Sequence, residues 1–127
     1  MDIDFLYLSD VLEIHRNQLE LYGGTDGVRD NGLLESAIAQ PQAMFAGNYL
    51  HEFPFEMAAA YLFHIVQNHP FLDGNKRTGA AVALVFLDFN GIELDAPKGA
   101  VYDITIAAAT GKADKAAIAK FFRSISK

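Results

Sequence analysis

The 127-residue sequence predicts an all-α fold, a compact helical bundle, on three observations. Residues 54–68 carry apolar side chains nearly all round, as a buried helix does, and residues 75–89 are mostly Ala, Val, Leu and Phe over a length too great for a strand. The segments before and after these two are flanked by residues typical of helix N-caps and of helix C-terminal stops. The β-branched run at 101–106 is too short to form a sheet without a partner.

The first helix is expected to run from about residue 10 to residue 22. Ser9 is the expected N-cap because its hydroxyl can accept a hydrogen bond from the first turn, and Asp10 would complement the positive end of the helix. Gly23 is expected to end this helix in a left-handed conformation.

The second helix is short and is followed by a connection without clear periodicity. Either Asp30 or Asn31 can cap a helix over residues 32–40, which must end near Pro41 because proline lacks the N–H and crowds the preceding turn. We expect a small hairpin in the connection at residues 46–53.

Two buried helices form the predicted centre of the bundle. Pro54 suits the first position of the earlier one. The later one follows a short loop at Asn75 and is closed by Asn90 and Gly91.

The C-terminal part is expected to hold a short helix or strand that ends at Gly111, and then an amphipathic helix. One face of that last helix carries Ile118, Phe121, Phe122 and Ile125.

Composition narrows the class of protein further. The length fits one domain over residues 1–127, and the absence of cysteine excludes disulfides and thiolate metal sites. Sixteen acidic against ten basic residues give a net charge of −6, which argues against a nucleic-acid surface. No apolar run is long enough for a membrane span and the N-terminus is acidic, so we expect a soluble cytoplasmic protein without a leader.

The stretch "NHPFLDGNKRTG", residues 68–79, breaks a local rule. Lys76 and Arg77 fall in the first turn of a predicted helix, where cations are disfavoured by about 0.3–1 kcal/mol each. A bound polyanion would offset this cost, because free N–H groups, an ammonium and a guanidinium together match phosphate oxygens. We therefore expect a phosphate site here.

The residues before this pair extend the hypothesis to a metal–nucleotide. Asp73 offers the hard carboxylate oxygen that Mg²⁺ takes together with phosphate oxygens, and Gly74 lets a ligand approach the backbone. The amide of Asn75 can donate to phosphate or orient the turn. His69 suits a general base, since histidine is the side chain best able to take up a proton near neutral pH.

Two further residues are expected to hold the loop rigid. Phe71 is predicted to insert into the core as an anchor, and Pro70 is expected to bias His69 toward an extended conformation.

Each fragment also has an ordinary interpretation, in which "DGN" is a turn and "KR" a solvated pair. The string is not a Walker A loop, and zinc is not expected, because His64 and His69 lie off a common helical face. His15 and His51 have no partner at ligand spacing.

The string "HPFLDGNKR" resembles the signature of the Fic/Doc (Fido) superfamily, HxFx[DE]GN, then Gly or Lys, then Arg. The segments "YGGTDGVRDNGLLESAIAQP" and "FLDFNG" resemble flanking parts of the Doc, or death on curing, toxins. The resemblance covers roughly residues 10 to 125 and implies a Fic-fold bundle whose motif loop binds nucleotide phosphates and Mg²⁺.

The resemblance implies a role for each motif position. His69 corresponds to the catalytic histidine and Asp73 to the Mg²⁺-binding acid. Asn75, Lys76 and Arg77 correspond to the phosphate-binding residues of the Doc branch.

The Doc branch implies a protein kinase that transfers the γ-phosphate of ATP, a toxin of a type II toxin-antitoxin system. AMP-transferring relatives have glycine in place of Lys76 and a second arginine in place of Ala80, whereas Gly74 follows the AMP-transferring pattern. An AMP transferase therefore stays an alternative, and so does a non-catalytic nucleotide-binding or phosphate-binding module.

The resemblance also implies partners. The expected substrate is elongation factor Tu, whose phosphorylation would inhibit translation, and the expected inhibitor is a Phd-type antitoxin. Self-inhibited relatives carry [ST]xxxE[GN], but here Ser9 and Glu13 are followed by Ile14. The segment "GNYLHEFPF", residues 47–55, is a candidate for docking an extended target segment by strand addition, or an ordinary connection.

Overall fold

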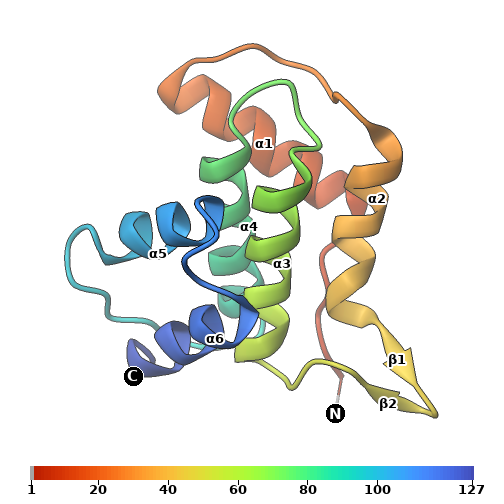
Figure 1. Ribbon diagram of the computed structural model, residues 1–127, viewed down its shortest axis with the longest axis vertical. Helices are drawn as coiled ribbons and strands as arrows, with labels where there is room; N and C mark the ends of the chain where they lie inside the picture. Colours follow the sequence, from red (N-terminus) through yellow and green to blue (C-terminus); the bar gives the residue numbers. More distant parts are fainter. Residues whose placement is uncertain (1) are drawn as a thin grey trace.

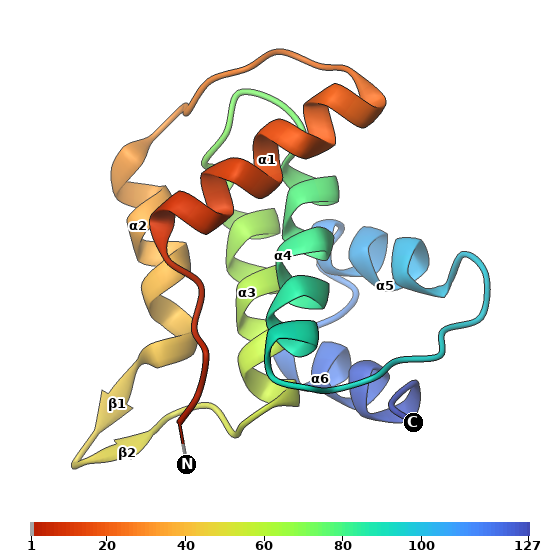
Figure 2. The ribbon, with the colours of Figure 1, turned by 180° about the vertical axis from the view of Figure 1, so that it is seen from behind.

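The computed structural model describes residues 2–127 and confirms the all-α prediction. Helices α3 (Phe55–Asn68) and α4 (Asn75–Phe89) run antiparallel through the centre (Figure 1). Helices α5 (Ala100–Ala109) and α6 (Lys115–Ser124) pack on α3 from one side, and α2 (Asn31–Ala39) packs on it from the other (Figure 2). None of the helices in the described chain has the length and apolar character needed to cross a membrane.

Helix α1 (Leu8–Tyr22) begins earlier than its sequence indicates. Tyr7 is the N-cap, and its N–H donates to the carboxylate of Asp10 at 2.7 Å, so the prediction that Ser9 caps this helix was wrong. Asp10 supplies the acceptor at the third position, which lets the helix start before Ser9. Gly23 ends the helix as expected, with φ 81° but an extended ψ of 176° instead of the left-handed value.

Helix α2 (Asn31–Ala39) starts where the sequence predicts. The Oδ1 atom of Asp30 accepts a hydrogen bond from the N–H of Leu33 at 2.9 Å, which settles the choice between the two candidate caps. The chain then tightens into a 3₁₀ turn (Gln40–Gln42) that contains the buried Pro41.

A small hairpin follows, as expected, although it lies a few residues earlier than predicted. Strands β1 (Met44–Phe45) and β2 (Asn48–Tyr49) pair antiparallel and are exposed. The ring of Tyr49 lies 5.7 Å from that of Phe5, so the N-terminal segment supports the hairpin.

The segment before Gly111, for which the sequence allowed either a short helix or a strand, is the helix α5. Thr105 is accommodated there because its hydroxyl donates to the carbonyl of Val101 at 2.7 Å, one turn back. The amphipathic helix is confirmed as α6, whose apolar face buries Ile118 and Phe122 and half-buries Phe121, while Ile125 is the buried C-cap that follows it.

The two central helices pack closely at Gly79, near the start of α4. A Cβ atom there would lie 2.8 Å from the Cγ2 atom of Val66 and 3.3 Å from the carbonyl oxygen of Leu62. A side chain at this position would push Val66 and the backbone of α3 aside, so glycine allows α4 to lie this close to α3.

Polar contacts of one lysine on α6 join that helix to α3 and to the segment that follows the hairpin. The Nζ atom of Lys115 lies 3.1 Å from the Nε2 atom of His64 and 3.2 Å from that of His51. Since an ammonium only donates, both imidazoles accept. Burial and then the neighbouring Lys115 lower the pKa of His64 to about 4, and the same two causes lower the pKa of His51.

We predict that His64 makes the folded protein less stable in mild acid. Its pKa falls from 6.5 to about 4 on folding, so the unfolded chain binds more protons and stability decreases as the pH falls through this window. Because His64 is only half-buried and its charge is screened, the expected loss is about 1 kcal/mol.

Urea unfolding from neutral pH to about pH 4 measures this loss. In His64→Gln the amide oxygen can still accept from Lys115 but does not titrate, so this variant should lose less stability over the same window. Equal losses in both proteins would contradict the assignment.

Candidate phosphate-binding site

The site is built on the loop between α3 and α4, residues 69–74. The segment after α1, residues 24–30, passes over the same end of the molecule (Figure 1). Val28 forms an isolated antiparallel bridge with Phe71, and the N–H of Leu72 donates to the carbonyl of Gly27 at 3.0 Å. The loop is thus paired along its length with a segment distant in the sequence.

Phe71 is the buried anchor that the sequence predicts. The ring of His15, from α1, stacks on it with centroids 3.8 Å apart and planes 6° apart. The Nε2 atom of the buried His15 lies 2.8 Å from the carbonyl oxygen of Asp73. A carbonyl only accepts, so Nε2 carries the proton and donates. His15 therefore fixes the backbone just before the start of α4.

The side chain of Asn75 closes the loop on itself. Its Oδ1 atom accepts from the N–H of Phe71 at 2.9 Å, and its Nδ2 group donates to the carbonyl of Phe71 at 3.0 Å. Both halves of the buried amide are thereby engaged. The backbone N–H of Asn75, which has no acceptor inside the helix, and the second hydrogen of its Nδ2 group are left to donate to a ligand.

The carboxylate of Asp73 is held at the surface by backbone donors. Oδ2 accepts from the N–H of Thr25 at 3.1 Å, and Oδ1 accepts from the N–H of Gly74 at 2.8 Å. These two hydrogen bonds, that from Thr25 first, lower the pKa of Asp73. The group is therefore charged near neutral pH, and its remaining lone pairs face solvent.

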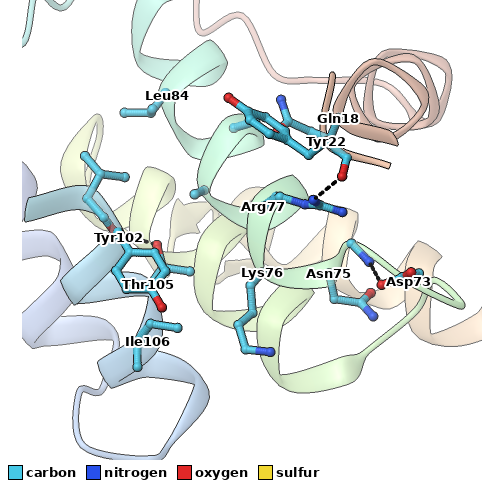
Figure 3. A pocket seen from close by; sticks show the side chains of 14 residues that line it. Gln18, Tyr22, Asp73, Asn75, Lys76, Arg77, Leu84, Tyr102, Thr105 and Ile106 are labelled. Atoms are coloured by element: carbon cyan, nitrogen blue, oxygen red, sulfur yellow. Dashed lines mark hydrogen bonds between the residues drawn. The ribbon is translucent and has the colours of Figure 1, made fainter. Parts of the chain in front are cut away.

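The two cations of the first turn of α4 differ in their surroundings. Arg77 donates to the carbonyl of Gly23 at 2.9 Å, and its guanidinium carbon lies 5.4 Å from the ring centroid of Tyr22. Lys76 is exposed and extends away from Arg77 (Figure 3). Within residues 2–127 its ammonium makes no hydrogen bond or ion pair.

A cavity of about 870 Å³ opens along these residues between α1, α4 and α5. Its polar end is formed by the start of α4. Its remaining wall is largely apolar (Figure 3), and the lining comprises Gln18, Tyr22, Asp73, Gly74, Asn75, Lys76, Arg77, Ala80, Ala81, Leu84, Val101, Tyr102, Thr105 and Ile106. The volume is within the range of pockets that bind small ligands.

The structure brings five of the six predicted site residues together at this cavity, and His69 does not line it. His69 is exposed at the end of α3 with φ 50° and ψ 54°. The prediction that Pro70 makes His69 extended was wrong. The helix ends here in a left-handed turn, in which the N–H of His69 still donates to the carbonyl of Ile65 at 3.2 Å.

Sequence reasoning gave no role to three residues that shape the site, His15, Thr25 and Arg29. The glycine-rich run "YGGTDGVRD", residues 22–30, was the available signal. It marks a segment that can approach another backbone closely, but it does not name the partner.

A helical bundle with an HxFxDGN loop feeding its second central helix is the arrangement expected of the Fic fold. The Fic/DOC family profile matches residues 5–87, and the chain belongs to this family.

Two curated relatives are both named after Doc. The protein kinase doc of Escherichia phage P1 is 35% identical over 117 residues, which cover 91% of this chain and 90% of the relative. The toxin Doc of Mycolicibacterium smegmatis is 45% identical over 75 residues, which cover 59% of this chain and 58% of the relative. The first similarity therefore extends over nearly the whole chain.

We predict that Gly24→Ala dislodges the carboxylate of Asp73. A Cβ at Gly24 would lie 2.9 Å from the Oδ2 atom of Asp73 and 2.9 Å from the Cδ2 atom of Leu19, at φ 127°. We expect a loss of about 1–3 kcal/mol in urea unfolding. By carboxyl NMR, the pKa of Asp73 should rise toward its usual value because the bond from Thr25 is lost.

The matched control is Gly91→Ala. Gly91 also has a positive φ, 76°, but a Cβ there meets no atom within 4 Å. It should cost about 1 kcal/mol and leave the pKa of Asp73 unchanged. An unchanged Asp73 in Gly24→Ala would contradict the proposed contact.

Proposed function

We propose that this protein is a Doc-type toxin that acts as a protein kinase, transferring the γ-phosphate of ATP to a hydroxyl of a protein substrate. The observation that carries the proposal is Lys76, an uncompensated cation at the N-terminus of α4 beside the cavity. Natural proteins tolerate such a conflict where a ligand resolves it. The kinase named among the relatives supports the same activity.

The cavity divides into two parts that suit a nucleotide. The free N–H groups of the first turn of α4, together with Lys76, would bind the phosphates. The apolar wall, which includes Leu84, Val101 and Ile106, would contact the base.

The residues present fit a magnesium ion held jointly with the phosphates. Asp73 is charged and exposed, and no group of three or more His, Cys, Asp or Glu in the described chain could hold a metal by itself. Mg²⁺ characteristically binds through one or two carboxylates plus phosphate oxygens. Bound there, it would neutralise charge on the phosphates.

His69 would act as the general base. Its imidazole is exposed, so a hydroxyl on a protein substrate can reach it. The imidazole takes the hydroxyl proton, the oxygen bonds to the γ-phosphorus, and the bond to the bridging oxygen breaks to release ADP.

AMP transfer is the alternative from the same family. Ala80, which lines the cavity, cannot supply the second arginine of AMP-transferring relatives, and Lys76 fills space that their glycine leaves open. Both features favour phosphate transfer. A non-catalytic phosphate-binding module is the third candidate, in which nucleotide binds and no acceptor changes mass.

The proposed partners follow from the family. Elongation factor Tu is the expected substrate, and a Phd-type antitoxin is the expected inhibitor. The hairpin is a candidate for docking the substrate, because it exposes Met44, Phe45 and Leu50 beside short strands that can pair with an added strand.

We predict that His69→Ala abolishes transfer and leaves the fold intact, because the side chain is exposed. The test is incubation with ATP labelled at both the α- and the γ-phosphate, Mg²⁺ and a bacterial extract. Only the γ-label should enter a protein acceptor, and only with the unmodified enzyme. Entry of the α-label would establish AMP transfer instead, and transfer by the folded variant would remove His69 from the mechanism.

We predict that Lys76→Ala separates stability from binding. Removing a cation from the first turn of α4 should stabilise the fold by about 0.3–1 kcal/mol. The same change should weaken ATP binding, measured by calorimetry with Mg²⁺ present. Lys98→Ala, at an exposed lysine outside the cavity, should leave the affinity unchanged. Undiminished affinity in Lys76→Ala would exclude this lysine from the phosphate site.

A further inference from the structure

His69 has a backbone conformation that must be held by its surroundings. Its φ of 50° and ψ of 54° lie in the left-handed region, which residues other than glycine rarely adopt. The direction of the imidazole depends on this conformation, because the Cα–Cβ bond is fixed by the backbone.

Arg29 is the residue that contacts this part of the backbone. Its Nε group donates to the carbonyl of His69 at 2.6 Å, and its Nη2 group donates to the carbonyl of Asn68 at 2.8 Å. The planar guanidinium matches two neighbouring acceptors in a way that a lysine ammonium cannot. These acceptors lie at the carbonyl end of α3, where positive charge is favoured.

The backbone beside Arg29 continues the same contact. The N–H of Arg29 donates to the carbonyl of Pro70 at 2.7 Å, and the N–H of Asp30 donates to that carbonyl at 3.1 Å. Three consecutive carbonyls, those of residues 68–70, thus accept hydrogen bonds from two consecutive residues. His69 is centred in this set.

The start of α2 anchors the other side of the contact. Asp30 caps α2, and the Nδ2 group of Asn68 donates to the carbonyl of Leu33 at 3.1 Å. Arg29 therefore connects the start of α2, which follows it in the chain, to the end of α3, which its side chain contacts. Its own side chain lies outside the cavity lining, so we do not expect it to contact the nucleotide.

We propose that Arg29 is a positioning residue that sets the orientation of His69 and thereby the rate of transfer. The inference rests on the proposed function, in which His69 is the base. Losing the two hydrogen bonds from the guanidinium of Arg29 would leave ATP binding intact but change the direction of the imidazole of His69. A displacement of about 1 Å in a reacting group can cost 10²-fold in rate, so kcat should fall by about 10- to 100-fold.

The decisive variant is Arg29→Lys, which keeps the charge but cannot bind both carbonyls in a fork. Arg16→Lys is the matched control, since Arg16 is exposed on α1 and does not line the cavity. With γ-labelled ATP, Arg29→Lys should lose kcat with an unchanged KM for ATP, and Arg16→Lys should change neither. A kcat within twofold of the unmodified enzyme, or a loss confined to KM, would overturn the inference.

NMR of the histidine side chains separates this inference from the proposed function, because it needs no activity. In the nucleotide-free protein, Arg29→Lys should shift or broaden the imidazole signals of His69 and leave those of His64 in place. An unchanged His69 signal would overturn the positioning role whether or not the enzyme is a kinase. If the unmodified protein transfers no label, the proposed function fails, and the His69 signals still decide the role of Arg29.

Discussion

The antiparallel pairing of residues 24–30 with the loop before α4 is the constraint on which the site depends. Neither segment belongs to a strand or a helix, so neither can pair its backbone N–H and C=O groups internally. Each uses the other: the loop donates from Leu72 to Gly27, and the segment donates from Thr25 to the carboxylate of Asp73. The loop loses its conformational entropy when the protein folds, so little further entropy is lost when a ligand binds to it.

This pairing also brings together two helix ends of opposite polarity. The carbonyl end of α1 contributes the oxygen of Gly23, and the amino end of α4 contributes Arg77, which donates to that oxygen. The attraction offsets the cost of placing Arg77 in a first turn. Lys76 has no such neighbour in the described part of the chain. Of the two cations that the sequence places in this first turn, only Lys76 is therefore left without a compensating contact.

Most local features were predictable from sequence, apart from the N-cap of α1, and distant contacts were not. The cap at Asp30 depends on atoms three residues away, and the helix it starts lies where the sequence indicates. In contrast, His15 reaches Asp73 across 58 residues, and Arg29 reaches His69 across 40. The family motif predicted five residues that line the cavity, but the residues that support them come from another segment and depend on how the helices pack. The left-handed turn at His69 was missed for this reason, because its support is not local.

Asn75 illustrates how a motif residue can shape a candidate ligand site by holding the backbone of its own loop. Its amide oxygen accepts from the N–H of Phe71 and its Nδ2 group donates to the carbonyl of Phe71, which leaves the main-chain N–H and one Nδ2 hydrogen of Asn75 to donate to a ligand. The start of α4 is held in place because the amide of Asn75 closes the loop and Phe71 is buried in the core. A shorter or apolar side chain would leave the buried N–H and carbonyl of Phe71 unpaired, which is costly away from water. The geometry of the loop itself therefore favours asparagine at this position, and the proposed phosphate site depends on that geometry.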